Sequence, residues 1–268
     1  MKITPPFENA RIEACFKRLK AEGKTGLVTF TMAYDPDRDT SLEIIDHLAH
    51  SGADIIELGM PFSDPMADGP AIAEAGLRAL ESGSTLVGIL ALAIAFRSAH
   101  PKIPLILMGY YNPIYHYGVE KFVRDAAIAG VDGLIIVDLP SEEDEDLYHF
   151  AAQQKLCLIK LVTPTTDSDR LKIILERATG FVYYVSVAGI TGMKSATGHS
   201  IKEALSEFRK MTDLPIAVGF GIKTSEQIRE LHGIADAVVV GSALVTAIKG
   251  HVGQEVKAVT KLVKRLIE

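Results

Sequence analysis

The chain has 268 residues, of which 48% are hydrophobic and 23% charged, and its formal net charge at pH 7 is −6. This composition supports a large apolar core and excludes an intrinsically disordered protein. The negative net charge and the lack of a Lys/Arg cluster argue against a nucleic-acid footprint or a polybasic membrane contact. We expect one domain, residues 1–268, because barrels of α/β units commonly have roughly 250 residues.

Neither the N-terminus nor the cysteines suggest export. The segment MKITPPFENA has no apolar signal region, and the longest apolar run, Leu86 to Phe96, is too short to span a bilayer. Cys15 and Cys157 lack metal-ligand spacing, so we interpret both as buried packing residues in a reducing compartment. These features predict a soluble, cytoplasmic protein.

Short apolar runs alternate with longer amphipathic segments along the chain. Eight runs are continuous and rich in Val and Ile, which is typical of parallel strands covered on both faces. They are residues 27–33, 54–59, 104–110, 132–138, 156–162, 181–187, 215–221 and 237–242. Helical patterns lie between them, among them 40–52, 71–80, 119–130, 141–154, 169–180, 201–211 and 224–233.

Eight such units in one uninterrupted chain predict a (β/α)8 TIM barrel, with an extra N-terminal helix and a short helix after the eighth strand. The segments GADIIELG, GVDGLIIVD and GIADAVVVG repeat one pattern, from a helix end through Asp into a strand. A doubly wound open sheet is the alternative. It would usually carry a glycine fingerprint after the first strand, which FTMAYDPD does not supply.

Glu57 ends an apolar strand, in the segment ELGMPFSDPMADGP. Side chains alternate along a strand, so Ile55 and Glu57 share one face while Ile56 and Leu58 share the other. If the second pair packs against helices, Glu57 points into the barrel mouth. There it would lose hydration and gain a raised pKa suited to proton transfer. A structural ion pair is the other interpretation.

Asp68 lies at the end of the same Pro-rich loop, directly before a helical pattern. It is either a second functional acid or a helix cap, which is a common role for Asp. These two interpretations of Asp68 remain open from the residues alone.

Small residues end the last two predicted strands. Gly219, Phe220 and Gly221 follow one strand, and Gly241 and Ser242 follow the next. Glycine lets backbone N–H groups approach an anion, and a helix beginning at Ser242 would direct its positive end toward the same point. Because barrels frequently bind phosphate after these two strands, we predict a phosphate site there rather than turn glycines.

The segment 186–200 is long, rich in small residues and contains three glycines. It is either a lid that closes over a ligand or a disordered connection. Tyr183, on the strand before it, is either a pocket wall or a core aromatic residue.

Several motifs together resemble the alpha subunit family of tryptophan synthase, over essentially the whole chain. They are ELGMPFSDPMADGP, MGYYNPI, VDLP, YYVSVAGITG, VGFGI and VGSALV. The resemblance implies a barrel that cleaves indole-3-glycerol phosphate to indole and glyceraldehyde 3-phosphate without a cofactor of its own. It also implies a beta subunit that binds pyridoxal phosphate, in an alpha2-beta2 complex.

The resemblance also implies roles for residues. By motif position it implies catalytic Glu57, Asp68 and Tyr183; phosphate binding by Gly192, Gly219, Phe220, Gly221, Gly241 and Ser242; a closing loop with Thr191; a substrate pocket with Phe30 and Tyr110; and a partner interface with Pro61, Asp64, Asn112 and Pro140.

The implied chemistry suits these residue types. Cleavage needs a proton delivered to the indole carbon that bears the side chain, and a proton removed from the adjacent hydroxyl. One carboxyl group of tuned pKa, Glu57, could do both in turn. Asp68 would hold the indole N–H, and the bound phosphate would orient the substrate.

The chain departs from the family at a few positions. Tyr34 stands where many relatives have Gly, which puts the shape of the first loop in doubt, while Met60 and Met66 replace Ile, Val or Leu. Two other functions stay open. A Schiff-base aldolase would use Lys160, the only lysine inside a predicted strand, although a stem reaching solvent is its simpler interpretation. A subunit that only activates a beta partner is the second.

Overall fold

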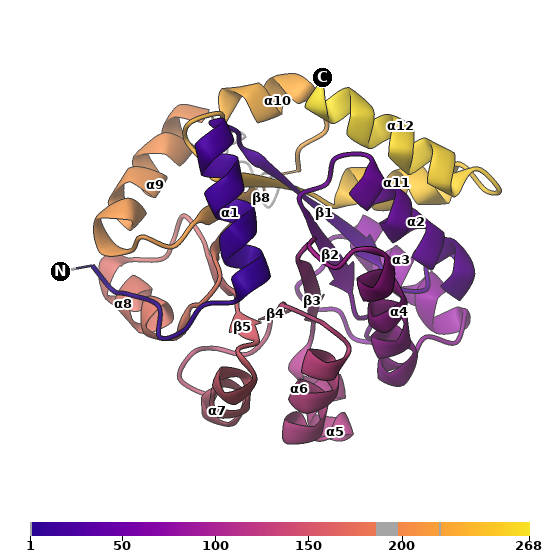
Figure 1. Ribbon diagram of the computed structural model, residues 1–268, viewed down its shortest axis with the longest axis horizontal. Coiled ribbons are helices and arrows are strands. Elements are labelled where there is room, and N and C mark those ends of the chain that lie inside the picture. Colours follow the sequence, from indigo (N-terminus) through magenta and orange to yellow (C-terminus); the bar gives the residue numbers. More distant parts are fainter. Residues whose placement is uncertain (1, 186–197, 220) are drawn as a thin grey trace.

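The computed structural model describes residues 2–185, 198–219 and 221–268, and the side chains of residues 198–200 are also outside the description. Its nine strands are β1 (Gly26–Met32), β2 (Ile55–Gly59), β3 (Leu105–Gly109), β4 (Gly133–Ile136), β5 (Cys157–Leu158), β6 (Lys160–Val162), β7 (Val182–Val185), β8 (Ile216–Gly219) and β9 (Ala237–Val240). Figure 1 shows them at the centre, inside a ring of helices.

The helices of the described ranges are α1 (Ala10–Glu22), α2 (Arg38–His50), α3 (Pro70–Glu81), α4 (Leu86–Ala99), α5 (Tyr111–Tyr117), α6 (Val119–Ile128), α7 (Glu145–Gln154), α8 (Ser168–Arg177), α9 (Gly198–Met211), α10 (Ser225–Glu230), α11 (Ser242–Gly250) and α12 (Glu255–Ile267). The predicted N-terminal helix is α1, and the predicted helix after the eighth strand is α11. The helical patterns named from the sequence include none at α4, α5 or α12.

The sheet is parallel throughout and runs in the order β5-β4-β3-β2-β1-β9-β8-β7-β6. β5 and β6 are two halves of one predicted strand, 156–162, divided at Ile159. Leu158 donates its backbone N–H to the hydroxyl of Thr179, at 2.7 Å, and so withholds it from a strand partner. The two halves of this strand are the two ends of the sheet, which forms a nearly closed barrel and confirms the predicted (β/α)8 fold.

The core has two layers that follow the alternation of side chains. Ile55 belongs to the inner cluster, which fills the barrel, whereas Ile56 and Leu58 belong to the outer cluster, between strands and helices. The prediction for this strand is confirmed. Cys15 and Cys157 are both buried in the inner cluster with free thiols, as expected. Burial raises the pKa of Cys15 to about 11 and that of Cys157 to about 12, so neither thiol is reactive at neutral pH.

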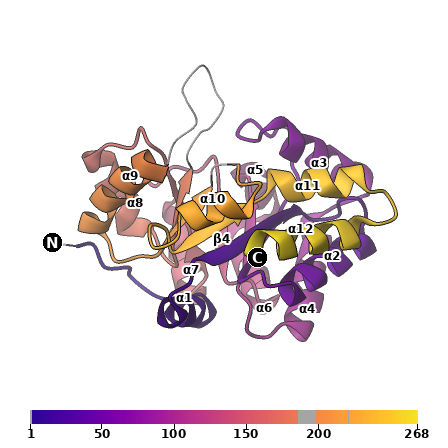
Figure 2. The same cartoon turned by 90° about the horizontal axis from the view of Figure 1, so that it is seen from above.

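Helix α1 covers the N-terminal end of the barrel. Its apolar face adds Ile12 and Phe16 to the inner cluster, and Arg11 binds the buried Asp132 with Nη1 at 2.8 Å. Figure 2 shows α1 on the opposite side of the barrel from α3 and α5. Because α1 blocks one end, the other end is left for a site.

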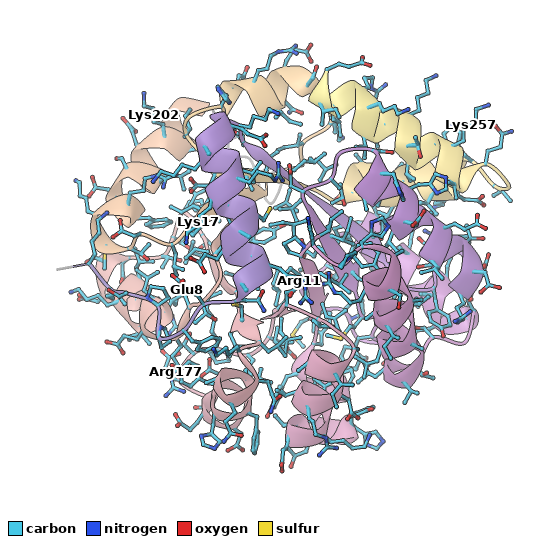
Figure 3. All side chains as sticks on the ribbon, viewed as in Figure 1. Glu8, Arg11, Lys17, Arg177, Lys202 and Lys257 are labelled. Atoms are coloured by element: carbon cyan, nitrogen blue, oxygen red, sulfur yellow. The ribbon has the colours of Figure 1, made fainter. Side chains whose placement is uncertain are left out.

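Charged side chains cover the outside of the helical ring. Lys202 and Lys257, both exposed, lie on its outer rim (Figure 3). Among the described residues no single helix is long and apolar enough to cross a membrane, although the bent pair α3 and α4 passes that test by length and composition.

One predicted helix start was wrong. Helix α7 begins at Glu145 rather than at residue 141. Residues 140–143 form a turn instead, in which Glu143 donates its N–H to the carbonyl of Pro140 at 3.0 Å. Asp144 then ends the turn as a fully buried partner of Lys160 and Arg177. This ion pairing requires residues distant in sequence, which the local helical pattern could not reveal.

Candidate active site

Glu57 is buried in the barrel near the C-terminal ends of the strands. It lies in register between Phe30 on β1 and Ile106 on β3, and 1% of its surface is exposed. Neither carboxyl oxygen has a hydrogen-bond partner among the residues that the structure describes. Burial without compensation raises the pKa of Glu57 to about 8. Glu57 therefore forms no structural ion pair with any residue that the structure describes, and this alternative interpretation is not supported.

Tyr183 approaches Glu57 inside the barrel. Burial, and then the neighbouring Glu57 charge, raise the pKa of Tyr183 well above its usual value, so its hydroxyl stays protonated at neutral pH. Its ring rests on β8 at Gly219, where an added Cβ would lie 2.7 Å from the Tyr183 hydroxyl. Gly219 is therefore needed for the position of Tyr183, a reason for glycine that the sequence did not reveal.

Asp68 is held by a tyrosine and does not cap a helix. The N-cap of α3 is Gly69, followed by Pro70, and no side chain caps this helix, so the capping interpretation of Asp68 is wrong. Tyr110 accepts a hydrogen bond from the N–H of Ala67 at 3.0 Å and also hydrogen-bonds the Asp68 carboxyl group. Partial burial raises the pKa of Asp68, and the bond from Tyr110 opposes that rise.

Tyr110 lies under this loop. It is 3% exposed, and its ring centroid is 5.3 Å from that of Phe62 in the same loop. Burial raises its pKa to about 12, so it remains a hydrogen-bond donor to Asp68. Its geometry is that of an anchor for the loop, and its role in a substrate pocket stays a prediction.

A buried ion pair that the sequence analysis missed fixes α3. Arg78 on α3 holds Asp35, after β1, through Nε at 2.7 Å and Nη2 at 2.8 Å. Asp35 is 1% exposed, and burial raises its pKa while Arg78 opposes this. The pair ties the helix behind Asp68 to the first loop. The two residues are 43 positions apart, so no local pattern could have indicated the contact.

Tyr34 shapes the same first loop. Its φ is 70°, in the left-handed region that favours glycine. Its N–H donates to the hydroxyl of Ser41 at 3.1 Å. Its hydroxyl packs against Gly88 of α4, where an added Cβ would lie only 2.1 Å from the hydroxyl oxygen. Contact with α4 thus supports a residue that would otherwise strain the loop.

The predicted phosphate site has the expected backbone features. Helix α11 begins at Ser242 with Gly241 as its N-cap and no side-chain cap, so N–H groups of its first turn are open to an anion. Gly221 has φ 75°, and nothing lies within 4 Å of an added Cβ. Phe30 packs against Gly241, whose added Cβ would lie 3.3 Å from the Phe30 Cβ. Phe30 thus links this region to its register neighbour Glu57.

Phe220, Thr191 and Gly192 lie outside the described residues, as does most of the segment 186–200. Their roles in phosphate binding and loop closure stay predictions.

Lys160 faces away from the barrel interior. Its neighbour Leu161 packs on the inner cluster, whereas the Lys160 ammonium group pairs with Asp144, which also binds Arg177 at 3.0 Å. The Lys160 side chain is 12% exposed, so the prediction of a stem reaching solvent is wrong. The ion pair with Asp144 holds this amine outside the barrel, away from Glu57.

The predicted partner residues follow β2, β3 and β4: Pro61, Asp64 and Pro140 lie in loops, whereas Asn112 lies in the first turn of α5. Asp64, Asn112 and Pro140 are exposed and Pro61 is partly exposed. Two large apolar side chains near them are also exposed, Met66 at 79% and Tyr115 at 70%. Exposed apolar groups rimmed by polar ones are typical of a protein interface.

A hollow of about 680 Å³ lies at the other end of the barrel, beside α1. Several of its charged residues are paired, among them Lys2 with Asp213 at 2.5 Å and Arg209 with Asp236 at 2.9 Å. The candidate site is the barrel end that holds Glu57, because Glu57 is a buried acid with no hydrogen-bond partner among the described residues. Around Glu57, the described chain offers no group of three His, Cys, Asp or Glu residues arranged for a metal.

Comparison with known proteins gives one family. The profile of the tryptophan synthase alpha chain matches residues 16–267. The fold is similar to tryptophan synthase subunit alpha from Legionella pneumophila, with 36% identity, a TM-score of 0.90, and coverage of 97% of this chain and 98% of that one. A structure from Aquifex aeolicus VF5 has 40% identity and a TM-score of 0.86, covering 96% and 97%. Tryptophan synthase of Mycobacterium tuberculosis has 34% identity and a TM-score of 0.88, covering 97% and 98%.

Proposed function

The chain belongs to the tryptophan synthase alpha chain family, and from this premise we propose that it is the lyase that cleaves indole-3-glycerol phosphate to indole and glyceraldehyde 3-phosphate. The observation that carries the proposal is Glu57, a fully buried carboxyl group without a partner in the described structure and with a pKa of about 8. Such a group is protonated at neutral pH yet can lose its proton, so it can act as acid and then as base.

The proton transfers balance through this one residue. The Glu57 carboxylic acid gives its proton to the indole carbon that bears the glycerol chain, which makes the ring an electron acceptor. The resulting carboxylate takes the proton of the adjacent hydroxyl as the carbon–carbon bond breaks. The bond electrons pass to the ring, which leaves as indole, and the oxygen becomes the aldehyde carbonyl. Glu57 ends the cycle protonated again.

Asp68 and the phosphate site orient the substrate in this proposal. The Asp68 carboxylate, positioned by Tyr110, accepts the indole N–H and stabilises the positive charge that protonation creates. Gly221, Gly241 and the first turn of α11 bind the phosphate. The charge of Asp68 and the proton of Glu57 thus act on the same ring.

We propose that the chain needs no cofactor of its own, because the protonated indole ring supplies the electron sink. Pyridoxal phosphate would belong to a beta partner, as the family implies. The proposed partner is the tryptophan synthase beta subunit in an alpha2-beta2 complex, and the proposed location is the cytoplasm.

The decisive test is an indole assay on the purified chain, with and without a beta subunit. We expect slow indole release by the chain alone and faster release in the complex. Release by the chain alone excludes the reading in which it only activates a partner. No release in either condition would refute the proposal.

A Schiff-base aldolase is tested at Lys160. We expect borohydride to trap no substrate on this residue and Lys160→Met to keep its cleavage rate, because the ammonium group lies outside the barrel in an ion pair with Asp144. Trapping of substrate on Lys160 would establish the aldolase instead.

The proposed partner face is tested by hydrogen exchange. On adding a beta subunit, we expect protection in the loops that contain Asp64 and Pro140 and in α5 around Asn112, all of which are exposed in the chain alone. Protection confined to α1, at the other barrel end, would overturn this assignment.

A further inference from the structure

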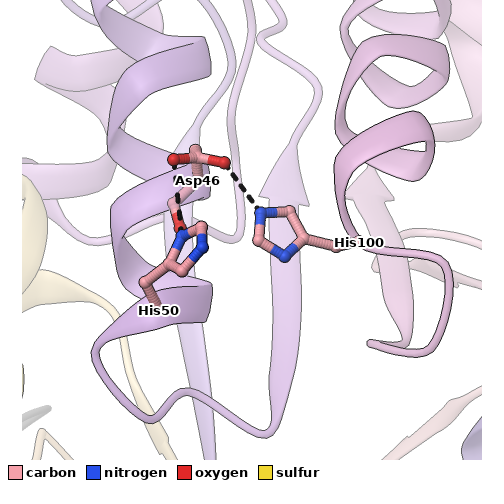
Figure 4. Close-up of side chains that lie close together, drawn as sticks. All are labelled: Asp46, His50 and His100. Atoms are coloured by element: carbon pink, nitrogen blue, oxygen red, sulfur yellow. Dashed lines mark hydrogen bonds and ion pairs between the residues drawn. The ribbon is translucent and has the colours of Figure 1, made fainter.

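Three potential metal ligands meet on the outside of the barrel, far from the chemistry proposed above. Asp46 and His50 lie in the last turns of α2, and His100 is the C-cap of α4. α2 leads into β2, and His100 leads into β3, so the group lies toward the N-terminal ends of the strands, away from Glu57. Figure 4 shows the Asp46 carboxylate between the two imidazoles.

The geometry brings one ligand atom from each residue close together. Asp46 and His50 are four residues apart on one helix and therefore share a face. His100 Nε2 is 2.8 Å from Asp46 Oδ1, and His50 Nδ1 is 3.4 Å from Asp46 Oδ2. The three ligand atoms all lie within 4.8 Å of one another.

His100 is held rigidly, whereas His50 can adjust. The His100 side chain is 8% exposed, and its ring stacks on Phe96 with centroids 4.8 Å apart. Its carbonyl accepts a hydrogen bond from Arg97 Nη1 at 2.7 Å. The His50 side chain is 67% exposed, so its ring can rotate toward a ligand and leaves an open side for water.

We propose that Asp46, His50 and His100 bind one Zn²⁺ ion that joins α2 to α4. Two imidazole nitrogens and one carboxylate oxygen form a donor set that zinc prefers, with water as the fourth ligand. The three ligand atoms now lie within 4.8 Å of one another. Rotation of His50 brings them closer, so that each can form a zinc–ligand bond of roughly 2.0–2.2 Å.

The proposed zinc ion stabilises the fold and takes no part in catalysis. Residues at the N-terminal face of such barrels stabilise the fold, while chemistry occupies the other face. Zinc that binds only the folded chain raises the unfolding temperature by mass action. Indole production stays unchanged, because neither α2 nor α4 supplies a residue to the proposed active site.

The test uses the full chain, stripped of metal by a chelator and titrated with ZnCl₂ in a calorimeter. We expect one equivalent to bind and the melting temperature to rise. Co²⁺ in the same site should give the visible absorption of a four-coordinate ion. Mg²⁺ should cause neither change, because it prefers six oxygen ligands.

Variants decide whether these three residues form the site. His100→Gln and the exposed His50→Gln should each weaken zinc affinity at least ~10-fold and remove the thermal shift. If the buried variant does not fold, His50→Gln alone decides. The matched control is His251→Gln, since His251 Nδ1 contacts the carbonyl four residues earlier at 2.9 Å, as His50 Nδ1 does. Unchanged affinity in His50→Gln, equal loss in the control, or equal binding of Mg²⁺ would overturn the proposal.

Discussion

Asp132 and Glu57 are carboxyl groups buried at opposite ends of the same barrel, with 0% and 1% of their surfaces exposed. Asp132 accepts from Arg11 Nη1 at 2.8 Å, from Arg97 Nη2 at 2.7 Å and from the Leu105 N–H at 2.9 Å. Glu57 has no such partner among the described residues, and its pKa rises to about 8. A buried charge that stabilises a fold is paired, whereas an unpaired buried acid costs stability and is kept for its proton.

The largest effect is expected at the unpaired acid. Glu57→Gln keeps the shape of the side chain but cannot exchange a proton, so indole production should fall by ~10²–10⁴-fold. Substrate should still bind, and the fold should persist because no partner charge is left uncompensated. Indole release, substrate affinity and thermal unfolding are measured on one preparation.

Glu255→Gln is the control for this change. Glu255 is also buried, at 9% exposure, but it lies on α12 and accepts from the N–H of Gly253, which a glutamine oxygen can also do. We expect its cleavage rate to stay near that of the parent. A folded Glu57→Gln variant that binds and cleaves at the parent rate would remove Glu57 from the mechanism.

The opposite outcome is expected at the paired acid. Asp132→Asn leaves the largely buried Arg97 without its counter-charge, so unfolding free energy should fall by roughly 3–5 kcal/mol. Cleavage per folded molecule should hardly change. Denaturant unfolding is compared with Asp213→Asn, in which an exposed pair with Lys2 is lost at a cost of about 0–1 kcal/mol. Equal losses in the two variants would show that the Asp132 network does not stabilise the barrel.

The sequence predicted the features that depend on neighbours along the chain. Apolar periodicity gave the strands, and alternation placed Ile55 inside and Ile56 outside, because both signals repeat within a few residues. Alternation also placed Glu57 inside. What it could not predict was the environment of that acid, since partners come from other strands.

The contacts that fix the rest of the site join distant positions. Tyr110 anchors the loop at Ala67 across 43 residues, and Arg78 reaches Asp35 across another 43. No periodic pattern encodes such a pairing. The strand 156–162 was likewise predicted as one piece, because the hydroxyl of Thr179 that interrupts its hydrogen bonding lies 21 residues from Leu158.

Stability against pH gives a third test of the unpaired acid. The pKa of Glu57 is raised from 4.5 to about 8 in the folded chain. Between these pH values the folded state therefore binds a proton that the unfolded state has released. Unfolding free energy attributable to Glu57 must fall as pH rises from about 4.5 to about 8.

Glu57→Gln should remove this pH dependence. The stability of the variant relative to the parent should increase with pH over that window, by on the order of a few kcal/mol in total. Cleavage by the parent should also decline as pH rises through about 8, because the acid form is lost. Parallel stability curves for the two proteins would show that Glu57 is ionised at neutral pH.

The smallest effect is expected at the phosphate site, where Gly221 offers a cleaner test than Gly219. A side chain at Gly219 would lie 2.7 Å from the Tyr183 hydroxyl and would therefore also displace Tyr183.

Gly221 and Gly253 both have positive φ, 75° and 78°, with nothing within 4 Å of an added Cβ. Alanine at either position should cost ~1–2 kcal/mol of backbone strain. Only Gly221→Ala should raise the KM for indole-3-glycerol phosphate several-fold and weaken inhibition by inorganic phosphate, because only Gly221 belongs to the proposed phosphate site. An equal rise in KM in Gly253→Ala would trace the effect to strain, and no rise in either would place the phosphate elsewhere on the barrel.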